Sequence, residues 1–279
     1  MNFNLVDTHA HLNFPDYQDD LDEVIKRSLE NGVKKIICVS SNLADSAKAI
    51  EIAKKYPDII YAAVGIHPHQ TDLQEKVSTE EQIKELEKMA KKKEVVAIGE
   101  CGLDFSLVSP AGGPAPPMEK DRPEKEQIFL FKKQIEIALN LDLPILVHSR
   151  KALPQVLKIL HSFKNKQSLL LRNKLTGVFH CYSGGKSDIK KIEELGFYFG
   201  LDGNLTYDLG LQNVVKEIPL EKILLETDCP FLSPEPFRGL RNEPKNVRMI
   251  AEFLAQTKGI TLKKAAQVST QNAQNLLKI

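Results

Sequence analysis

Short apolar runs alternate along the chain with longer segments in which apolar residues recur every three or four positions. Each run is continuously apolar rather than apolar at every second residue, which is typical of parallel strands covered on both faces. We therefore predict one strand for each run. The eight runs are Leu5–Leu12, Lys35–Ser41, Ile59–His67, Val95–Asp104, Pro144–Arg150, Thr176–Ser183, Phe197–Gly203 and Lys222–Asp228.

The segments between the runs have the periodicity of amphipathic helices. "DDLDEVIKRSLENG" places acidic residues in its first turn and Gly32 beyond its end, as helix ends favour. "EKEQIFLFKKQIEIALNLDLP" and "KSDIKKIEELG" follow the same pattern, Pro244 begins another helix, and residues 261–279 form a last one. Strands that alternate with helices favour βαβ units, and eight units in about 250 residues predict an α/β fold, the (β/α)₈ TIM barrel. A doubly wound open sheet is the alternative, but "DTHAHLN" lacks the glycine-rich loop expected after its first strand.

One segment interrupts this alternation. Residues 106–123, "SLVSPAGGPAPPMEKDRP", are rich in proline and glycine and predict a loop insertion after the fourth strand. We favour a surface insertion over a lid that covers the site. The 279 residues show no repeat, linker or shift in composition, so we predict a single domain over residues 1–279.

Composition limits the partners. The 38 basic and 37 acidic residues give a net charge of +1, and there is no tryptophan. Proteins that hold long nucleic acids usually carry a basic excess, so a nucleic-acid substrate would be held locally, for example at an end. No apolar run approaches the roughly 20 residues of a membrane span, and no secretory signal is visible. We expect a cytoplasmic protein with reduced cysteines, no membrane contact and no obligate protein partner.

Candidate metal ligands lie at the ends of five predicted strands. His9 and His11 alternate in the first run and therefore point to the same side. Barrel enzymes gather their catalytic groups at the C-terminal ends of strands. Six nitrogen or carboxylate donors exceed the roughly three that one catalytic zinc takes from a protein, and they suit two divalent ions that share a carboxylate. The six residues are His9, His11, Glu100, His148, His180 and Asp228.

Several other residues near these positions are candidates for further roles or are excluded as ligands. Arg150 shares the side of His148 and is a candidate phosphate ligand, as is Arg238, although either is equally well explained as a surface cation. Glu226 shares the side of Asp228 and is a candidate for orienting the ligands. The cysteines that directly follow three ligands face the other way if the backbone stays extended, and we exclude them as ligands. They are Cys101, Cys181 and Cys229.

The motifs "DTHAHL", "GIHPH", "GECGLDF", "PILVHSR", "HCYSG" and "LLETDCPFLSPEPFRGLRNEP" resemble successive motifs of the TatD family over nearly the whole chain. That family comprises metal-dependent hydrolases of the amidohydrolase-like barrels, many of them described as deoxyribonucleases. The resemblance implies that Glu100 bridges two ions. It assigns the first ion to His9, His11, Glu100 and Asp228, and the second to Glu100, His148 and His180.

The resemblance also places His67 beside the substrate, although a role in rigidifying the loop is equally compatible with "GIHPH". Two features depart from the family. Asp202 in "GLDGNLTYD" stands where small or apolar residues are usual, and we favour a turn cap over a place in the site. The insertion at residues 106–123 lengthens a loop that is usually shorter.

We therefore expect metal-assisted hydrolysis of a phosphodiester, with two divalent ions that lower the pKa of a bound water and Asp228 as proton acceptor. The resemblance implies DNA as substrate, as single strands or ends, by 3′ to 5′ exonuclease action. Hydrolysis of a C–N or ester bond in a small molecule is the alternative, and a non-catalytic protein is a third. Such ligands accept Zn, Mn, Fe, Co or Ni and, less readily, Mg, so the sequence leaves the metal open.

Overall fold

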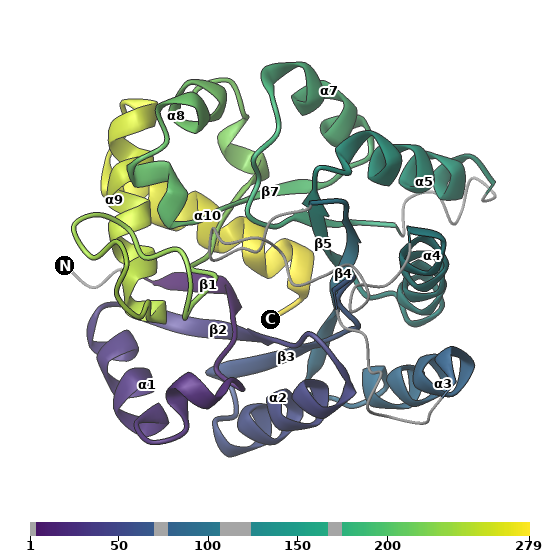
Figure 1. The fold of residues 1–279 in the computed structure, drawn as a ribbon. Coiled ribbons are helices and arrows are strands. Elements are labelled where there is room, and N and C mark those ends of the chain that lie inside the picture. The colour runs from purple at the N-terminus through teal and green to yellow at the C-terminus, as the bar shows by residue number, and fades with distance from the viewer. Residues whose placement is uncertain (1–3, 70–77, 107–123, 167–174) are drawn as a thin grey trace.

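A computed structural model describes residues 4–69, 78–106, 124–166 and 175–279. Apart from Ser106, the proline- and glycine-rich insertion lies outside these residues. Eight parallel strands form one sheet in the order β1 to β8 (Figure 1). A bridge between Ala10 and Cys229 joins the first strand to the segment after the last, so the sheet closes into the predicted (β/α)₈ barrel. The strands are β1 Leu5–Ala10, β2 Val33–Val39, β3 Ile60–Val64, β4 Val95–Asp104, β5 Ile145–Arg150, β6 Gly177–Phe179, β7 Tyr198–Leu201 and β8 Ile223–Leu225.

Helices surround the barrel (Figure 1). The α-helices are α1 Leu21–Glu30, α2 Leu43–Lys55, α3 Thr79–Ala90, α4 Glu124–Leu141, α5 Leu153–Lys166, α7 Lys186–Glu194, α8 Leu209–Val215, α9 Val247–Lys258 and α10 Leu262–Leu277. Short 3₁₀ helices are η1 Pro15–Tyr17, η3 Gly203–Thr206, η4 Leu220–Lys222 and η5 Pro244–Asn246. Pro244 thus begins η5, which leads directly into α9. None of the described helices is long and apolar enough to cross a membrane.

Small and branched side chains fill the barrel interior, and α10 covers the N-terminal end of the barrel. Interior positions include Val6 of β1, Leu146 of β5 and Leu224 of β8, which pack with Leu276 and Leu277 of α10. Side chains of α10 also donate hydrogen bonds to backbone carbonyls that precede β1 and β8. The last helix therefore seals the N-terminal end of the barrel and leaves the C-terminal end for chemistry.

Most strands are shorter than predicted, and β1 and β4 are irregular. The pairing register shifts between Asp7 and Ala10 in β1 and between Ile98 and Cys101 in β4. Before each shift, Val6 and Ala97 face the barrel interior. Strict alternation from these positions would point His9 and Glu100 outward. A one-residue irregularity reverses the side of every later residue, so the shifts turn both side chains inward.

The strands β4 and β5 approach closely at Gly102. A Cβ atom at this position would lie 1.9 Å from the carbonyl oxygen of His148, so only glycine fits. Because of this close approach, the parts of β4 and β5 at the C-terminal end of the barrel lie directly against each other.

Candidate metal centre

The six predicted ligands meet at the C-terminal end of the barrel. His9, Glu100 and His148 lie within β1, β4 and β5, whereas His180 directly follows β6 and Asp228 lies three residues after β8. Ligand atoms within 4.8 Å of one another form three groups in the described part of the chain. The groups are His9 with His11 and Glu100, His9 with His180 and Asp228, and His67 with Glu100 and His148.

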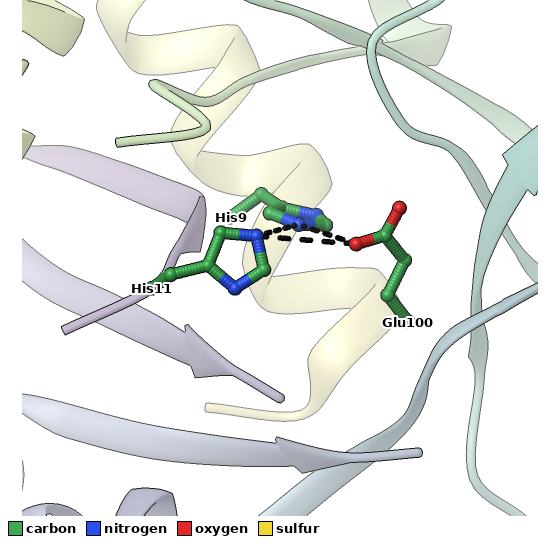
Figure 2. Close-up of side chains that lie close together, drawn as sticks. All are labelled: His9, His11 and Glu100. Carbon is green, nitrogen blue, oxygen red and sulfur yellow. Dashed lines mark hydrogen bonds and ion pairs between the residues drawn. The ribbon is translucent and has the colours of Figure 1, made fainter. Parts of the chain in front are cut away.

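The first predicted set surrounds a small space between β1, β4 and the end of β8. Figure 2 shows the rings of His9 and His11 turned toward one oxygen of Glu100. The two Nε2 atoms are 3.3 Å apart and lie 3.5 and 3.9 Å from Glu100 Oε2. Asp228 Oδ1 lies 3.6 Å from His9 Nε2 and 3.4 Å from His11 Nε2. Each Nε2 atom thus faces the carboxylates of both Glu100 and Asp228.

The second predicted set faces the other oxygen of the same carboxylate. Glu100 Oε1 lies 2.6 Å from His148 Nδ1 and 2.7 Å from His180 Nε2. His67 Nε2 is also close, at 3.4 Å from Oε1. Glu100 therefore directs Oε2 at one group of imidazoles and Oε1 at another, which is the arrangement of a carboxylate that could bridge two ions.

Asp104 is a buried carboxylate that the sequence analysis missed. Its Oδ2 lies 2.9 Å from His148 Nε2 and 2.7 Å from His69 Nε2. The side chain of Gln127 in α4 accepts a hydrogen bond from the backbone N–H of Asp104 and donates one to the backbone carbonyl of Asp104. A carboxylate behind a ligating imidazole fixes the ring and its tautomer. The signal was present in "GECGLDF", since Asp104 follows Glu100 by four residues and shares its side of β4.

Two further carboxylates lie behind the centre without joining the groups above. Glu226 accepts a hydrogen bond from the backbone N–H of Cys181 and lies 3.7 Å from His180 Nδ1. Burial raises the pKa of Glu226 to about 8. Asp202 caps η3 by accepting from the backbone N–H of Asn204, so its side chain has the turn-capping place that the sequence favoured. Burial raises the pKa of Asp202 to about 6.

The electrostatics of the centre suit a cation. Burial lowers the pKa of His9 and of His67 to about 4, so both imidazoles are neutral and keep a lone pair. Burial also opposes charge on His180, but the carboxylates of Glu100, Glu226 and Asp228 raise its pKa to about 10. His9 Nδ1 has no hydrogen-bond partner within the described residues. Positive charge is stabilised here among histidine and carboxylate donors, so the residues fit divalent ions.

The backbone turns sharply beside two of these residues. Cys181 has φ 45° and Asp228 has φ 53°, both in the left-handed region that non-glycine residues rarely adopt. The extended backbone assumed for the cysteines is therefore wrong at Cys181, and Cys229 follows a residue that is itself not extended. No cysteine belongs to the ligand groups found among the described residues. Such local strain is typical of functional sites.

The predicted substrate residues differ in their distance from the centre. His67 lies among the candidate ligands. Arg150 ends β5 and, with Lys151, His180 and other residues, lines a cleft of about 550 Å³. Arg238 is exposed in the loop after β8, where its guanidinium lies 4.2 Å from the ring centroid of Tyr207. Among the described residues, Arg150 and His180 thus line the same cleft, whereas Arg238 does not line it.

Comparison with known proteins agrees with this architecture. The family model described as TatD related DNase matches residues 6–278. An uncharacterized metal-dependent hydrolase of Bacillus subtilis, YabD, is 36% identical, with 99% of each chain covered. The human deoxyribonuclease TATDN3 is 31% identical over 98% of this chain and 94% of its own.

A solved structure extends the likeness to the fold. The TatD homologue YJJV of Escherichia coli superimposes with a TM-score of 0.85 at 26% identity, over 100% of both chains. Family model, relatives and fold all cover essentially the whole sequence. The chain belongs to the TatD family of metal-dependent hydrolases.

Proposed function

We propose that this protein is a metal-dependent phosphodiesterase that cleaves DNA, as single strands or at ends. The observation that carries the proposal is Glu100, whose two oxygens face separate groups of imidazoles. A centre with a shared carboxylate suits the in-line displacement of a phosphodiester. The human relative named a deoxyribonuclease supports the choice of substrate.

Each side chain has a defined part in this proposal. His9, His11, Glu100 and Asp228 would hold one ion, and Glu100, His148 and His180 the other. Divalent ions bound there would acidify a water molecule and neutralise phosphate charge.

Three further side-chain roles concern the attacking water, the phosphate and the orientation of His148. The carboxylate of Asp228, 13% exposed, is open to the site and accepts the proton of the attacking water. Arg150 at the cleft donates hydrogen bonds to a phosphate oxygen. Asp104 holds the ring of His148 from behind, at 2.9 Å from Nε2.

A small-molecule ester or amide is the second candidate substrate. The net charge of +1 gives little attraction to a long polyanion, and a cleft of about 550 Å³ has the size of a typical small-molecule site. The same centre would serve this reaction, so the two candidates are separated by substrate and not by site.

The test is cleavage of a labelled single-stranded oligonucleotide with Mn²⁺, Mg²⁺ or Zn²⁺ and with a chelator. We expect a ladder of products that disappears on metal removal. Asp228→Asn should lower turnover by about 10² to 10⁴-fold, because the proton acceptor is lost. Glu100→Ala should reduce the content of both ions, measured by elemental analysis.

His161→Ala is the matched control, because this histidine lies on α5 away from the centre, and its cleavage should equal that of the wild type. Full turnover in Asp228→Asn would remove Asp228 from the mechanism. Metal-loaded protein that cleaves no oligonucleotide but hydrolyses a small ester or amide would establish the second candidate instead.

A further inference from the structure

An exposed aromatic ring lies at the edge of the metal centre. Phe231 follows Asp228 by three residues, and its backbone N–H donates to the Asp228 carbonyl at 2.9 Å, so the turn fixes its position. The side chain is 49% exposed, the largest exposed fraction among the phenylalanines of the described residues. A phenyl ring held by this turn beside polar side chains offers a flat apolar face to a ligand at the centre.

Two neighbouring rings contact Phe231 in edge-to-face geometry. Its centroid is 6.1 Å from that of Phe14 and 6.2 Å from that of His11, with interplanar angles of 76° and 66°. Phe14 in turn stacks on His11 at 4.6 Å. These edge contacts fix the ring orientation of Phe231, while about half of its surface stays open to a ligand.

A row of rings leads from Phe231 across the centre to the cleft. His11 is 5.0 Å from His9, and His9 stacks on His180 at 4.2 Å. His180 lines the cleft that contains Arg150. A chain molecule whose reacting group lies at the metal centre would therefore extend toward Arg150 on one side and Phe231 on the other.

Resting on the proposed function, we propose that Phe231 stacks an unpaired nucleobase next to the scissile phosphodiester. The sugar separates each base from its phosphate, so a phosphate at the centre leaves its base beside the nearest exposed ring. Stacking on an aromatic side chain tolerates every base, because each has a π face. A paired base is already stacked in its duplex, so this subsite selects single strands or frayed ends.

The loop that carries Phe231 also holds an exposed cation. The guanidinium of Arg238 lies over the Tyr207 ring, and Arg238 belongs to the loop that carries Phe231. No ion pair to Arg238 is found in the described residues, so its charge is available to a phosphate of the bound strand. This arrangement combines stacking with backbone neutralisation, as proteins that bind single strands do.

The experiment compares two end-labelled oligonucleotides of equal length. One carries normal bases, and the other has tetrahydrofuran in place of the bases at the cleaved end. We expect wild type to have a kcat/KM about ten- to a hundredfold higher on the first, mainly through KM. For Phe231→Leu, we expect kcat/KM on the normal substrate to fall to the value that wild type has on the baseless substrate. On the baseless substrate itself, Phe231→Leu and wild type should have equal kcat/KM. Phe231→Trp should keep the preference.

Phe129→Leu is the matched control, since this exposed phenylalanine lies on α4 in the outer helix layer and should leave both rates unchanged. Equal losses on both oligonucleotides in Phe231→Leu, or no loss on either, would overturn the stacking role and leave the nuclease function intact. Cleavage of neither substrate by wild-type protein would overturn both proposals. Thermal melting of each variant shows whether it is folded.

Discussion

Single side chains behind the candidate ligands decide how the imidazoles of the centre are oriented. Asp104 is almost wholly buried and contacts His148 and His69 through one oxygen. The hydrogen bond that it accepts from Nε2 leaves Nδ1 of His148 facing Glu100. Burial opposes charge on Asp104, but hydrogen bonds to His148 and His69 hold the pKa of this carboxyl below its usual range. An ionised partner behind the ring raises the basicity of the ligand.

Asp104→Asn should therefore weaken metal binding and turnover by about 10- to 100-fold. Competition with a chelator measures the affinity, and melting of metal-free protein reports on stability. Asp142→Asn, at a surface pair with Lys278, is the control and should bind metal like wild type. Unchanged metal affinity in Asp104→Asn would show that this carboxylate only packs.

Residue patterns in the sequence identified the six groups that converge, because the strand ends of a barrel meet at one edge. His67, which the resemblance places beside the substrate, lies among the candidate ligands, 3.4 Å from Glu100. Strict alternation along β1 would put Asp7 on the side of His9, whereas Asp7 accepts hydrogen bonds from Thr227. Such differences depend on local backbone turns, which residue type and spacing do not encode.

At the scale of elements, a charged cluster joins α1 to the loop that follows β8. Glu243 accepts hydrogen bonds from Arg27 of α1 at 3.0 Å, and Arg27 and Arg241 both pair with Asp20. Burial raises the pKa of Glu243, but Arg27 and Lys245 outweigh it and lower the pKa below its ordinary value. The loop that carries Phe231 is thereby fixed to the first helix.

Glu243→Gln should lower the free energy of unfolding by about 2 kcal/mol at neutral pH, because a charged hydrogen bond is lost. Since the folded pKa lies below the unfolded value of about 4.3, this contribution is complete above about pH 5 and disappears as pH falls through the folded pKa. Denaturant unfolding at several pH values measures the difference.

Glu217→Gln, at an exposed pair with Lys186, should change the free energy of unfolding by less than about 1 kcal/mol at any pH. A difference between wild type and Glu243→Gln that stays constant as the solution is acidified would contradict the ionic origin of the effect.

Element order was predictable because each strand run and each helical period is continuous in the sequence. The register shifts in β1 and β4 were not, although they decide which way His9 and Glu100 point. A one-residue irregularity leaves no mark in a continuously apolar run, since both faces of such a strand are buried. Most predicted strands also extend too far, because apolar residues continue beyond the strands into the loops that form the site.

At the scale of the whole molecule, the two ends of the barrel have different tasks. The C-terminal end gathers the histidines and carboxylates, and α10 seals the other end with Leu276 and Leu277. Stability and chemistry are therefore separated along the barrel axis, as in other barrels of this type.

Leu277→Ala should cost about 3 kcal/mol of unfolding free energy, because the buried side chain leaves a cavity against the interior strands. The kcat/KM of the folded variant should equal that of wild type, since the change lies at the far end. Leu209→Ala, at a side chain 73% exposed, is the control and should leave the melting temperature nearly unchanged. A large fall in kcat/KM for Leu277→Ala would show that the two ends are coupled.

The barrel closes where the backbone of Asp228 donates to His9 and that of His11 donates to Cys229, beside the ligands themselves. The first and last parts of the sheet must therefore meet before the centre is complete. During synthesis on the ribosome, His9 and His11 emerge long before Asp228 does. A nascent chain consequently holds only part of the candidate ligand set, and the proposed metal centre can form only after the segment that follows β8 has left the exit tunnel.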